Sequence, residues 1–377
     1  MTQQLKILNI VGARPNLPKI APLMREMGRH PQIEPILVHT GQHYDEQLSD
    51  IFFRQMGIPA PHVNLEVGSG SHAAQTAEIL KRIEPVLIEQ KPDLVLVVGD
   101  VNSTIAVSLA AVKLGIRVAH VEAGLRSFDR TMPEEINRIL TDALADYLFI
   151  TEEDAAEHLL KEGRPKEAIF FVGNVMIDSL RHFLPIAHKS PIGGELHLKN
   201  GAHGGEAWKR FAVLTLHRPS NVDSTEKLTE LLGAVDAVAR EIPVIFPVHP
   251  RTQQRLTQAG IQHHPNLRLV PPVGYVDFLC LLSKATLVLT DSGGIQEETT
   301  ALGVPCLTLR ENTERPITIS QGTNLLVGTE PAKIVAAARE VLSGKSKAGR
   351  IPPLWDGHAA ERIVETLLRL LPGRKEA

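Results

Sequence analysis

The sequence has few aromatic residues, two cysteines and almost no excess charge. Ten Phe, three Tyr and two Trp among 377 residues offer little material for stacking on bases, and a formal net charge of -3 provides no basic face for nucleic acid or an anionic membrane. Cys280 and Cys306 lie in apolar segments, which is typical of buried thiols in a reducing cytosol. No signal-peptide pattern and no bilayer-length apolar run is present, so we expect a cytoplasmic protein.

Several catalytic and cofactor signatures are missing as well. The 16 histidines and 43 acidic residues form no His-Glu-x-x-His motif, and the cysteines lack zinc-site spacing. There is no Walker A lysine motif, no Gly-x-Gly-x-x-Gly after the first predicted strand and no Gly-x-Ser-x-Gly elbow. These absences argue against a metal enzyme, a P-loop protein, a common dinucleotide-binding enzyme and a serine hydrolase.

Short apolar runs alternate with helical patterns along the whole chain. This alternation predicts parallel sheets that are covered by helices on both faces. A stretch over 191–205 contains five glycines and one proline and is predicted to be a connector. The apolar runs cover residues 6–11, 34–38, 94–98, 117–121, 147–150 and 168–172, and then 211–215, 243–247, 267–270, 285–290 and 304–309.

The pattern therefore predicts two doubly wound α/β units in tandem. We expect an N-terminal Rossmann-like domain over 1–188, a linker over 189–205 and a C-terminal domain over 206–354. A closing helix over about 355–372 is expected to pack back onto the first domain. Because ligands of such sheets bind at the carboxyl ends of the strands, we expect a site in a cleft between the domains.

The residues after the apolar run 285–290 are predicted to bind an anion. Ser292 can cap the next helix, and Gly293 and Gly294 let the backbone approach a ligand at the positive end of that helix. Glu298, one turn further on, would then lie near a sugar hydroxyl. Taken alone, the segment is more typical of a capped strand-to-helix turn without a ligand.

Polar side chains also follow strands of the first half. Arg14 and Lys19 suit a diphosphate, although such residues are often merely solvated. Asp100 is either a general base or the cap of the next helix. His120 and Glu122 flank a buried position, which is costly unless both are paired, so we expect this strand end to face a cleft.

Two further features remain ambiguous on sequence grounds. Glu134 and Glu135 open a predicted helix, where complementarity to the helix dipole explains one acid readily and can explain both. His217 and His249 each follow a strand of the second half, at equivalent positions. One such histidine is usually structural, whereas two, opposite the acids of the first half, favour a functional site.

Nine motifs in register carry a family resemblance over residues of about 5–370. They are Gly12-Ala13-Arg14-Pro15 with Lys19, Thr40-Gly41-Gln42-His43, Gly99-Asp100, His120-Val121-Glu122-Ala123-Gly124-Leu125-Arg126, Pro133-Glu134-Glu135-Ile136-Asn137-Arg138, His217-Arg218, Pro247-Val248-His249-Pro250, Asp291-Ser292-Gly293-Gly294 with Glu298, and Thr313-Glu314-Arg315-Pro316. Their order and spacing closely resemble those of the non-hydrolysing UDP-N-acetylglucosamine 2-epimerases. The resemblance implies a GT-B fold, with two Rossmann-like domains around a central cleft and UDP held mainly by the second domain.

The resemblance also implies a reaction and its residues. UDP-GlcNAc and UDP-ManNAc would interconvert at C2 by anti elimination of UDP to a 2-acetamidoglucal and re-addition, with no cofactor or metal. Two proton-handling groups on opposite faces of the sugar are then needed. The catalytic residues would be Asp100, Glu122, Glu134 and His217, with Asp100 and Glu134 as the acid/base pair. The substrate-binding residues would be Arg14, Lys19 and Arg315 at the phosphates, Ser292, Gly293 and Gly294 at the diphosphate, Glu298 at the ribose, Phe278 and Val273 at the uracil, and Gln42 and His249.

Two departures from the family's commonest pattern bear on specificity. Asn16 stands where many members have glutamate, and Pro219-Ser220 stands where many have Arg-Glu. They leave open the sugar substituents and regulatory binding of a second substrate molecule. The alternatives are a hydrolysing epimerase that releases ManNAc and UDP, an epimerase of a modified UDP-GlcNAc, a GT-B glycosyltransferase and a non-catalytic nucleotide-sugar sensor. A homodimer and a role in surface polysaccharide biosynthesis are implied by the resemblance alone.

Overall fold

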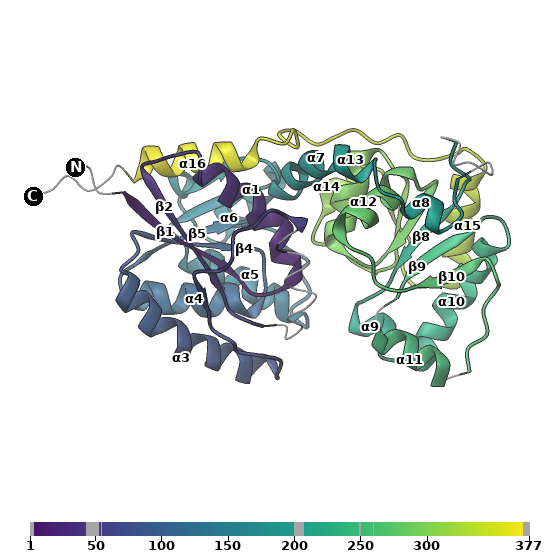
Figure 1. Cartoon of the computed structure of the whole chain (residues 1–377), viewed down its shortest axis with the longest axis horizontal. Coiled ribbons are helices and arrows are strands. Elements are labelled where there is room, and N and C mark those ends of the chain that lie inside the picture. Colours follow the sequence, from purple (N-terminus) through teal and green to yellow (C-terminus); the bar gives the residue numbers. More distant parts are fainter. Residues whose placement is uncertain are drawn as a thin grey trace, which may run out of the picture. The chain divides into compact units, whose positions relative to one another are not determined.

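A computed structural model of the chain describes residues 4–42, 53, 55–199, 207–248, 250–258 and 260–371. The chain divides into two compact units, of which unit 1 comprises Met1–Ser179 with Pro353–Ala377 and unit 2 comprises Leu180–Pro352. Each unit contains one parallel sheet with helices around it (Figure 1). The predicted two-domain α/β fold is confirmed. Among the described helices, none is both long enough and apolar enough to cross a bilayer.

Unit 1 is built on a seven-stranded parallel sheet with the order β3-β2-β1-β4-β5-β6-β7. All five residues of the central strand β4 are buried, which explains its uninterrupted apolar sequence. Val98 of β4 pairs with Val121 of β5, so the residues after these two strands leave the sheet at the same edge. The strands are β1 Leu5–Val11, β2 Ile33–His39, β3 Val63–Asn64, β4 Leu94–Val98, β5 Arg117–Val121, β6 Tyr147–Ile150 and β7 Ile169–Phe171.

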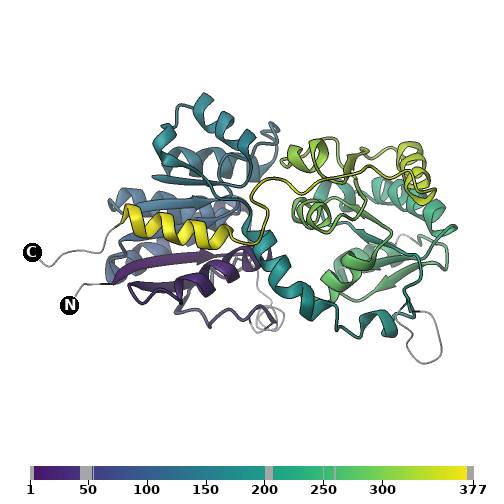
Figure 2. The same ribbon diagram turned by 90° about the horizontal axis from the view of Figure 1, so that it is seen from above.

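The helices of unit 1 are amphipathic elements that cover this sheet, and the last of them comes from the end of the chain. The helix α16 packs against α1, as Figure 2 shows in yellow. Asp178 caps α16 from a distant helix, because its carboxylate accepts hydrogen bonds from the Ala359 and Ala360 amides at 3.1 and 2.7 Å. The helices are η1 Arg14–Asn16, α1 Leu17–Met27, α3 His72–Gln90, α4 Asn102–Lys113, α5 Pro133–Leu144, α6 Glu153–Lys161, η2 Lys166–Ala168, α7 Val175–Ala187 and α16 Ala359–Leu370.

Unit 2 repeats this architecture with a six-stranded parallel sheet in the order β10-β9-β8-β11-β12-β13. Thr290 of β11 pairs with Thr215 of β8 and with Thr308 of β12, so three strands end at one level. The strands are β8 Ala212–Thr215, β9 Val244–Pro247, β10 Leu267–Val270, β11 Leu287–Thr290, β12 Cys306–Thr308 and β13 Asn324–Leu326. The helices are α8 Ile192–Glu195, α9 Pro219–Val222, α10 Thr225–Ala239, α11 Pro250–Gln258, α12 Tyr275–Lys284, α13 Gly293–Leu302, α14 Pro316–Ser320 and α15 Pro331–Leu342.

The described part of the stretch predicted as a connector contains regular structure. It includes the short helix α8, and Lys199 forms an antiparallel bridge with Trp208. Gly193 is a glycine because the Trp208 ring packs directly on its Cα, where a Cβ would overlap the ring. Composition does not reveal this close packing. The division between the units falls after Ser179, inside α7.

Candidate active site

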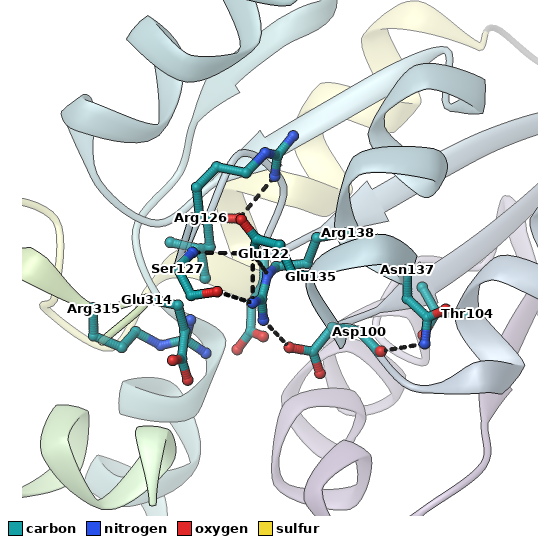
Figure 3. Close-up of polar contacts among 12 residues, drawn as sticks. Asp100, Thr104, Glu122, Arg126, Ser127, Glu135, Asn137, Arg138, Glu314 and Arg315 are labelled. Atoms are coloured by element: carbon teal, nitrogen blue, oxygen red, sulfur yellow. Dashed lines mark hydrogen bonds and ion pairs between the residues drawn. The ribbon is translucent and has the colours of Figure 1, made fainter. Parts of the chain in front are cut away.

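Asp100 follows β4 and is held by the helix α5. Its carboxylate forms an ion pair with Arg138, and its main-chain carbonyl accepts a hydrogen bond from the Asn137 amide at 2.9 Å. The Arg138 guanidinium is buried and also donates to Glu135 at 2.7 and 3.0 Å (Figure 3). The Asp100 side chain keeps 25% of its surface exposed. It is therefore fixed in place and still accessible to a ligand.

Glu122 follows β5 at the same edge of the sheet. It is buried and has a left-handed backbone with φ of 71°, which is unusual for a residue with a side chain. Its carboxylate forms an ion pair with Lys19 at 2.5 Å. Gly99 packs on this pair, since a Cβ there would lie 3.0 Å from the Lys19 ammonium and 3.5 Å from Glu122 Oε2. Lys19, expected at a phosphate, thus contacts a predicted catalytic acid.

The two glutamates at the start of α5 have different environments. Glu135 is buried and accepts hydrogen bonds from the Ser127 and Phe128 amides at 3.0 and 2.8 Å. It therefore holds the loop that precedes α5. Glu134 is half-buried in the first turn of the same helix. Glu135 is thus the acid that holds the loop and Glu134 is the accessible one, a distinction that the sequence left open.

Two other predicted ligands of unit 1 lie near the end of β1. Arg14 is the half-buried first residue of η1. Gln42 is buried, and its Oε1 accepts a hydrogen bond from the Ser103 hydroxyl at 2.8 Å. Gln42 therefore supports the start of α4, and its contact with substrate stays a prediction.

In unit 2, Asp291 organises the ends of β8 and β11. This buried carboxylate accepts hydrogen bonds from the His217 and Arg218 amides and from the Asn221 side chain, all at 3.0–3.1 Å, and contacts His217 Nδ1 at 2.8 Å. Burial acts to raise the pKa of Asp291, but the His217 contact and the other donors lower it. Because an ionised carboxylate only accepts, His217 Nδ1 carries a proton, and 58% of the His217 side chain is exposed. Sequence reasoning missed this anchoring role of Asp291.

An arginine cluster surrounds Glu314 in unit 2. Arg310 contacts the buried Glu314 carboxylate at 2.7 Å and Arg218 contacts it at 3.5 Å, while Arg315 pairs with Glu297 at 2.6 Å. Burial would raise the pKa of Glu314, but the neighbouring arginines hold it well below its usual range. Three guanidinium groups against these two carboxylates leave an excess of positive charge. Arg315, predicted at the phosphates, lies in this cluster.

The start of α13 adjoins the same cluster. A Cβ on Gly293 would lie 2.5 Å from Glu314 Oε1, so a residue with a side chain would displace this carboxylate. Ser292 occupies the N-cap position, but within the described part of the chain its hydroxyl makes no capping hydrogen bond, contrary to our expectation. The amides of this helix start therefore combine with the arginine excess in a setting that suits an anion.

The remaining predicted ligands of unit 2 lie along α12 and α13. Glu298 is fully buried and accepts a hydrogen bond from the Tyr275 hydroxyl at 2.9 Å. Burial raises the pKa of Glu298 to about 7 and also raises that of Tyr275. Phe278 is half-buried on α12, and Val273 is half-buried just before it. His249 lies outside the described residues. Among those residues, no three metal-ligating side chains form a group that could hold a metal ion.

Two Rossmann-like units, one with acids at its strand ends and one with an arginine-rich helix start, define an α/β protein of the GT-B class. The chain matches the family model described as UDP-N-acetylglucosamine 2-epimerase over residues 25–368. The chain belongs to that family, so the family membership predicted from the nine motifs is confirmed.

Individual relatives agree with this assignment over nearly their whole length. A UDP-N-acetylglucosamine 2-epimerase homolog of Methanococcus maripaludis is 45% identical over 97% of this chain and 100% of its own. A UDP-2,3-diacetamido-2,3-dideoxy-D-glucuronate 2-epimerase of Pseudomonas aeruginosa is 42% identical over 97% of this chain and 100% of its own. The structure is similar to that of Methanocaldococcus jannaschii UDP-GlcNAc 2-epimerase in complex with UDP-GlcNAc and UDP, with a TM-score of 0.87 and 41% identity over 97% of this chain and 99% of that one.

Proposed function

We propose that this chain interconverts UDP-GlcNAc and UDP-ManNAc without hydrolysis. Family membership supports an epimerase, and a 41% identical relative is described in complex with UDP-GlcNAc and UDP. The observation that carries the proposal is the group of acids at the strand ends of unit 1. Asp100 and Glu122 leave adjacent strands at one edge, each paired with a buried cation.

The acids of unit 1 fit the proton transfers of this reaction. Removal of the weakly acidic hydrogen at C2 requires a general base, while UDP leaves from C1. Asp100 and Glu134 are the accessible acids, and we assign them as the acid/base pair. Glu122 is buried against Lys19, so we assign it an orienting role. Return of the proton to the opposite face, with re-addition of UDP, gives the epimer.

Unit 2 is assigned the nucleotide. The start of α13 and Arg315 would bind the diphosphate and stabilise the charge that develops as UDP departs. Glu298 would accept the ribose hydroxyl, and Phe278 would stack on uracil beside Val273. Arg14 remains a predicted phosphate ligand, Gln42 and His249 remain predicted substrate contacts, and His217 remains a predicted orienting residue. The ion pair of Lys19 favours a role at Glu122 over one at a phosphate.

One experiment tests the reaction directly. The purified chain is mixed with UDP-GlcNAc in D2O without any acceptor, and proton NMR follows the sugar. UDP-ManNAc with deuterium at C2 is the expected product. Free ManNAc and UDP would identify a hydrolysing epimerase, and an unchanged spectrum would refute UDP-GlcNAc as the substrate.

The substrate's substituents need a second arm of the same assay, because a 42% identical relative is named for a 2,3-diacetamido glucuronate sugar. UDP-2,3-diacetamido-2,3-dideoxyglucuronate is offered under identical conditions. A higher kcat/KM for it than for UDP-GlcNAc would replace the proposed substrate with the modified one.

Matched variants separate catalytic from supporting acids. We expect Asp100→Asn and Glu134→Gln to keep the fold and lose exchange at C2. Glu135→Gln is expected to lower the thermal midpoint, because the Ser127 and Phe128 amides of the loop before α5 donate to both Glu135 carboxylate oxygens. Glu157→Gln, on the exposed face of α6, serves as the control with unchanged turnover. Full activity of Glu134→Gln would remove that residue from the mechanism.

Three wider assignments accompany the proposal. A homodimer and a supply of UDP-ManNAc to surface polysaccharide synthesis stay predictions from the family resemblance, and a cytoplasmic location stays a prediction from the sequence. Analytical ultracentrifugation of the purified chain tests the first of them.

A further inference from the structure

A histidine without any solvent exposure lies beneath the proposed catalytic acids. His120 Nδ1 is 2.6 Å from Asp142 Oδ1, and Nε2 is 2.8 Å from the Gly99 carbonyl oxygen. A carbonyl oxygen only accepts, so Nε2 carries a proton. Burial acts to raise the pKa of Asp142, but His120 and Arg126 lower it, so this carboxylate is ionised and also only accepts. The His120 ring therefore links the Asp142 carboxyl group to the Gly99 carbonyl.

This buried pair joins three segments, each of which bears a proposed catalytic acid. The Gly99 carbonyl, held by His120, immediately precedes Asp100. Asp142 Oδ2 accepts the Gly124 amide at 3.0 Å, two residues after Glu122. Asp142 itself belongs to α5, the helix that carries Glu134 in its first turn.

The backbone at these positions needs such support. Gly99 has φ of 68°, Glu122 of 71° and Gly124 of 78°, all in the left-handed region. For Glu122 this conformation costs free energy and persists only where surrounding contacts determine it. Arg126 completes the set of contacts, since its Nη2 lies 2.7 Å from Asp142 Oδ2. A rearrangement of either strand end would break hydrogen bonds to the buried pair.

We propose that His120 is a positioning residue, whose ring, held between Asp142 and the Gly99 carbonyl, keeps the strand ends that carry Asp100 and Glu122 in their reactive geometry. The proposal rests on the proposed epimerase function. Because His120 is fully buried, it acts through these neighbours and not by contact with the sugar. A displacement of about 1 Å at a reacting group costs up to about 100-fold in rate. A loss of position should therefore appear in kcat.

The test compares His120→Gln with the full-length wild-type chain. We expect kcat for deuterium incorporation at C2 to fall by roughly 10- to 100-fold, while KM for UDP-GlcNAc changes by less than about twofold. Asp142→Asn should give the same pattern. His120→Gly should be rescued in part by added imidazole, which can refill the cavity. His30→Gln, at a partly exposed histidine at the end of α1, is the control.

The result has clear alternatives. Wild-type kcat in both His120→Gln and Asp142→Asn would overturn the proposal, and so would a loss of activity that matches the unfolded fraction measured by near-UV circular dichroism. A direct measurement needs no variant to fold. Nitrogen-15 NMR of the wild type should show one slowly exchanging imidazole N–H proton, and its absence would refute the buried hydrogen bond from His120 to the Gly99 carbonyl. A wild-type chain without C2 exchange would instead refute the proposed function.

Discussion

Gly293, at the start of α13, and Gly233, inside α10, offer a test in which one methyl group is added to each of two helices of unit 2. At Gly293 the new Cβ would lie 2.5 Å from Glu314 Oε1, and at the exposed Gly233 it would meet nothing within 4 Å. Glu314 cannot simply swing away, because it is buried and contacts Arg310 at 2.7 Å. Gly293→Ala therefore strains the arginine cluster, and Gly233→Ala does not.

The magnitude follows from the distances. Relief of the clash needs a shift of about 1 Å in the Glu314 carboxylate, which stretches its contact with Arg310 beyond about 3.5 Å and breaks that hydrogen bond. A buried hydrogen bond to a charged group contributes about 1.5–3 kcal/mol, and alanine regains at most about 1 kcal/mol of helix propensity. We expect Gly293→Ala to lose about 1–2 kcal/mol and Gly233→Ala to gain up to about 1 kcal/mol.

Thermal unfolding of the full chain measures the difference. At about 2–4 °C per kcal/mol for a domain of this size, the two variants should differ in Tm by roughly 2–12 °C. The transition of unit 2 is the one that the proposed ligand UDP raises in the wild type. Equal Tm values for the two variants would show that Glu314 is not fixed by its arginines, and the reasoning would fail.

Three further predictions concern single side chains. Burial raises the pKa of Asp178 to about 6, so the folded state binds this proton more tightly than the unfolded chain does. The free energy of unfolding should therefore fall by up to about 3 kcal/mol as the pH rises from about 4 to about 6. Urea titrations of Asp178→Asn should lack that decline. In Arg138→Lys the lysine keeps the charge but cannot bridge the Asp100 and Glu135 carboxylates, so the rate of C2 exchange should fall about tenfold or more. An undiminished rate would contradict the bridging role of the Arg138 guanidinium. Since burial raises the pKa of Glu298 to about 7, calorimetry should show UDP-GlcNAc affinity rising up to about tenfold between about pH 6 and about pH 8, whereas Glu298→Gln should be flat.

The strands and the edge that bears the acids could be predicted from the sequence. The five residues of β4 are all buried and form an uninterrupted apolar run, which is typical of a central strand in a sheet covered on both faces. Because the strands are parallel, their carboxyl ends all lie at one edge of the sheet. The two-residue strand β3 and the three-residue β13 were not predicted, because so few residues give no periodicity. Pairing in the sheet, and not local pattern, creates these edge strands.

The partners of the acids could not be predicted, because they are distant in the sequence. Lys19 and Glu122 are 103 residues apart, and Arg138 reaches Asp100 across 38. Glu134 and Glu135 differ for a simpler reason. Successive helical residues point about 100° apart, so one of them faces the loop and the other does not. Composition treats the two acids as equivalent, and only the orientation of α5 distinguishes them.

The surroundings of Asn16 and Ser220 are compatible with the two departures from the family's commonest pattern. Asn16 is buried, its Oδ1 accepts the Gly12 and Ala13 amides, and its Nδ2 donates to the Val98 carbonyl at 3.1 Å, a bond that a glutamate at this position could not donate. In the second departure Ser220 is exposed, whereas the retained Asn221 is buried and binds Asp291. Asp291 in turn holds His217. The retained Asn221 thus fixes a proposed functional group through Asp291, whereas Asn16 makes hydrogen bonds within unit 1 and Ser220 faces solvent.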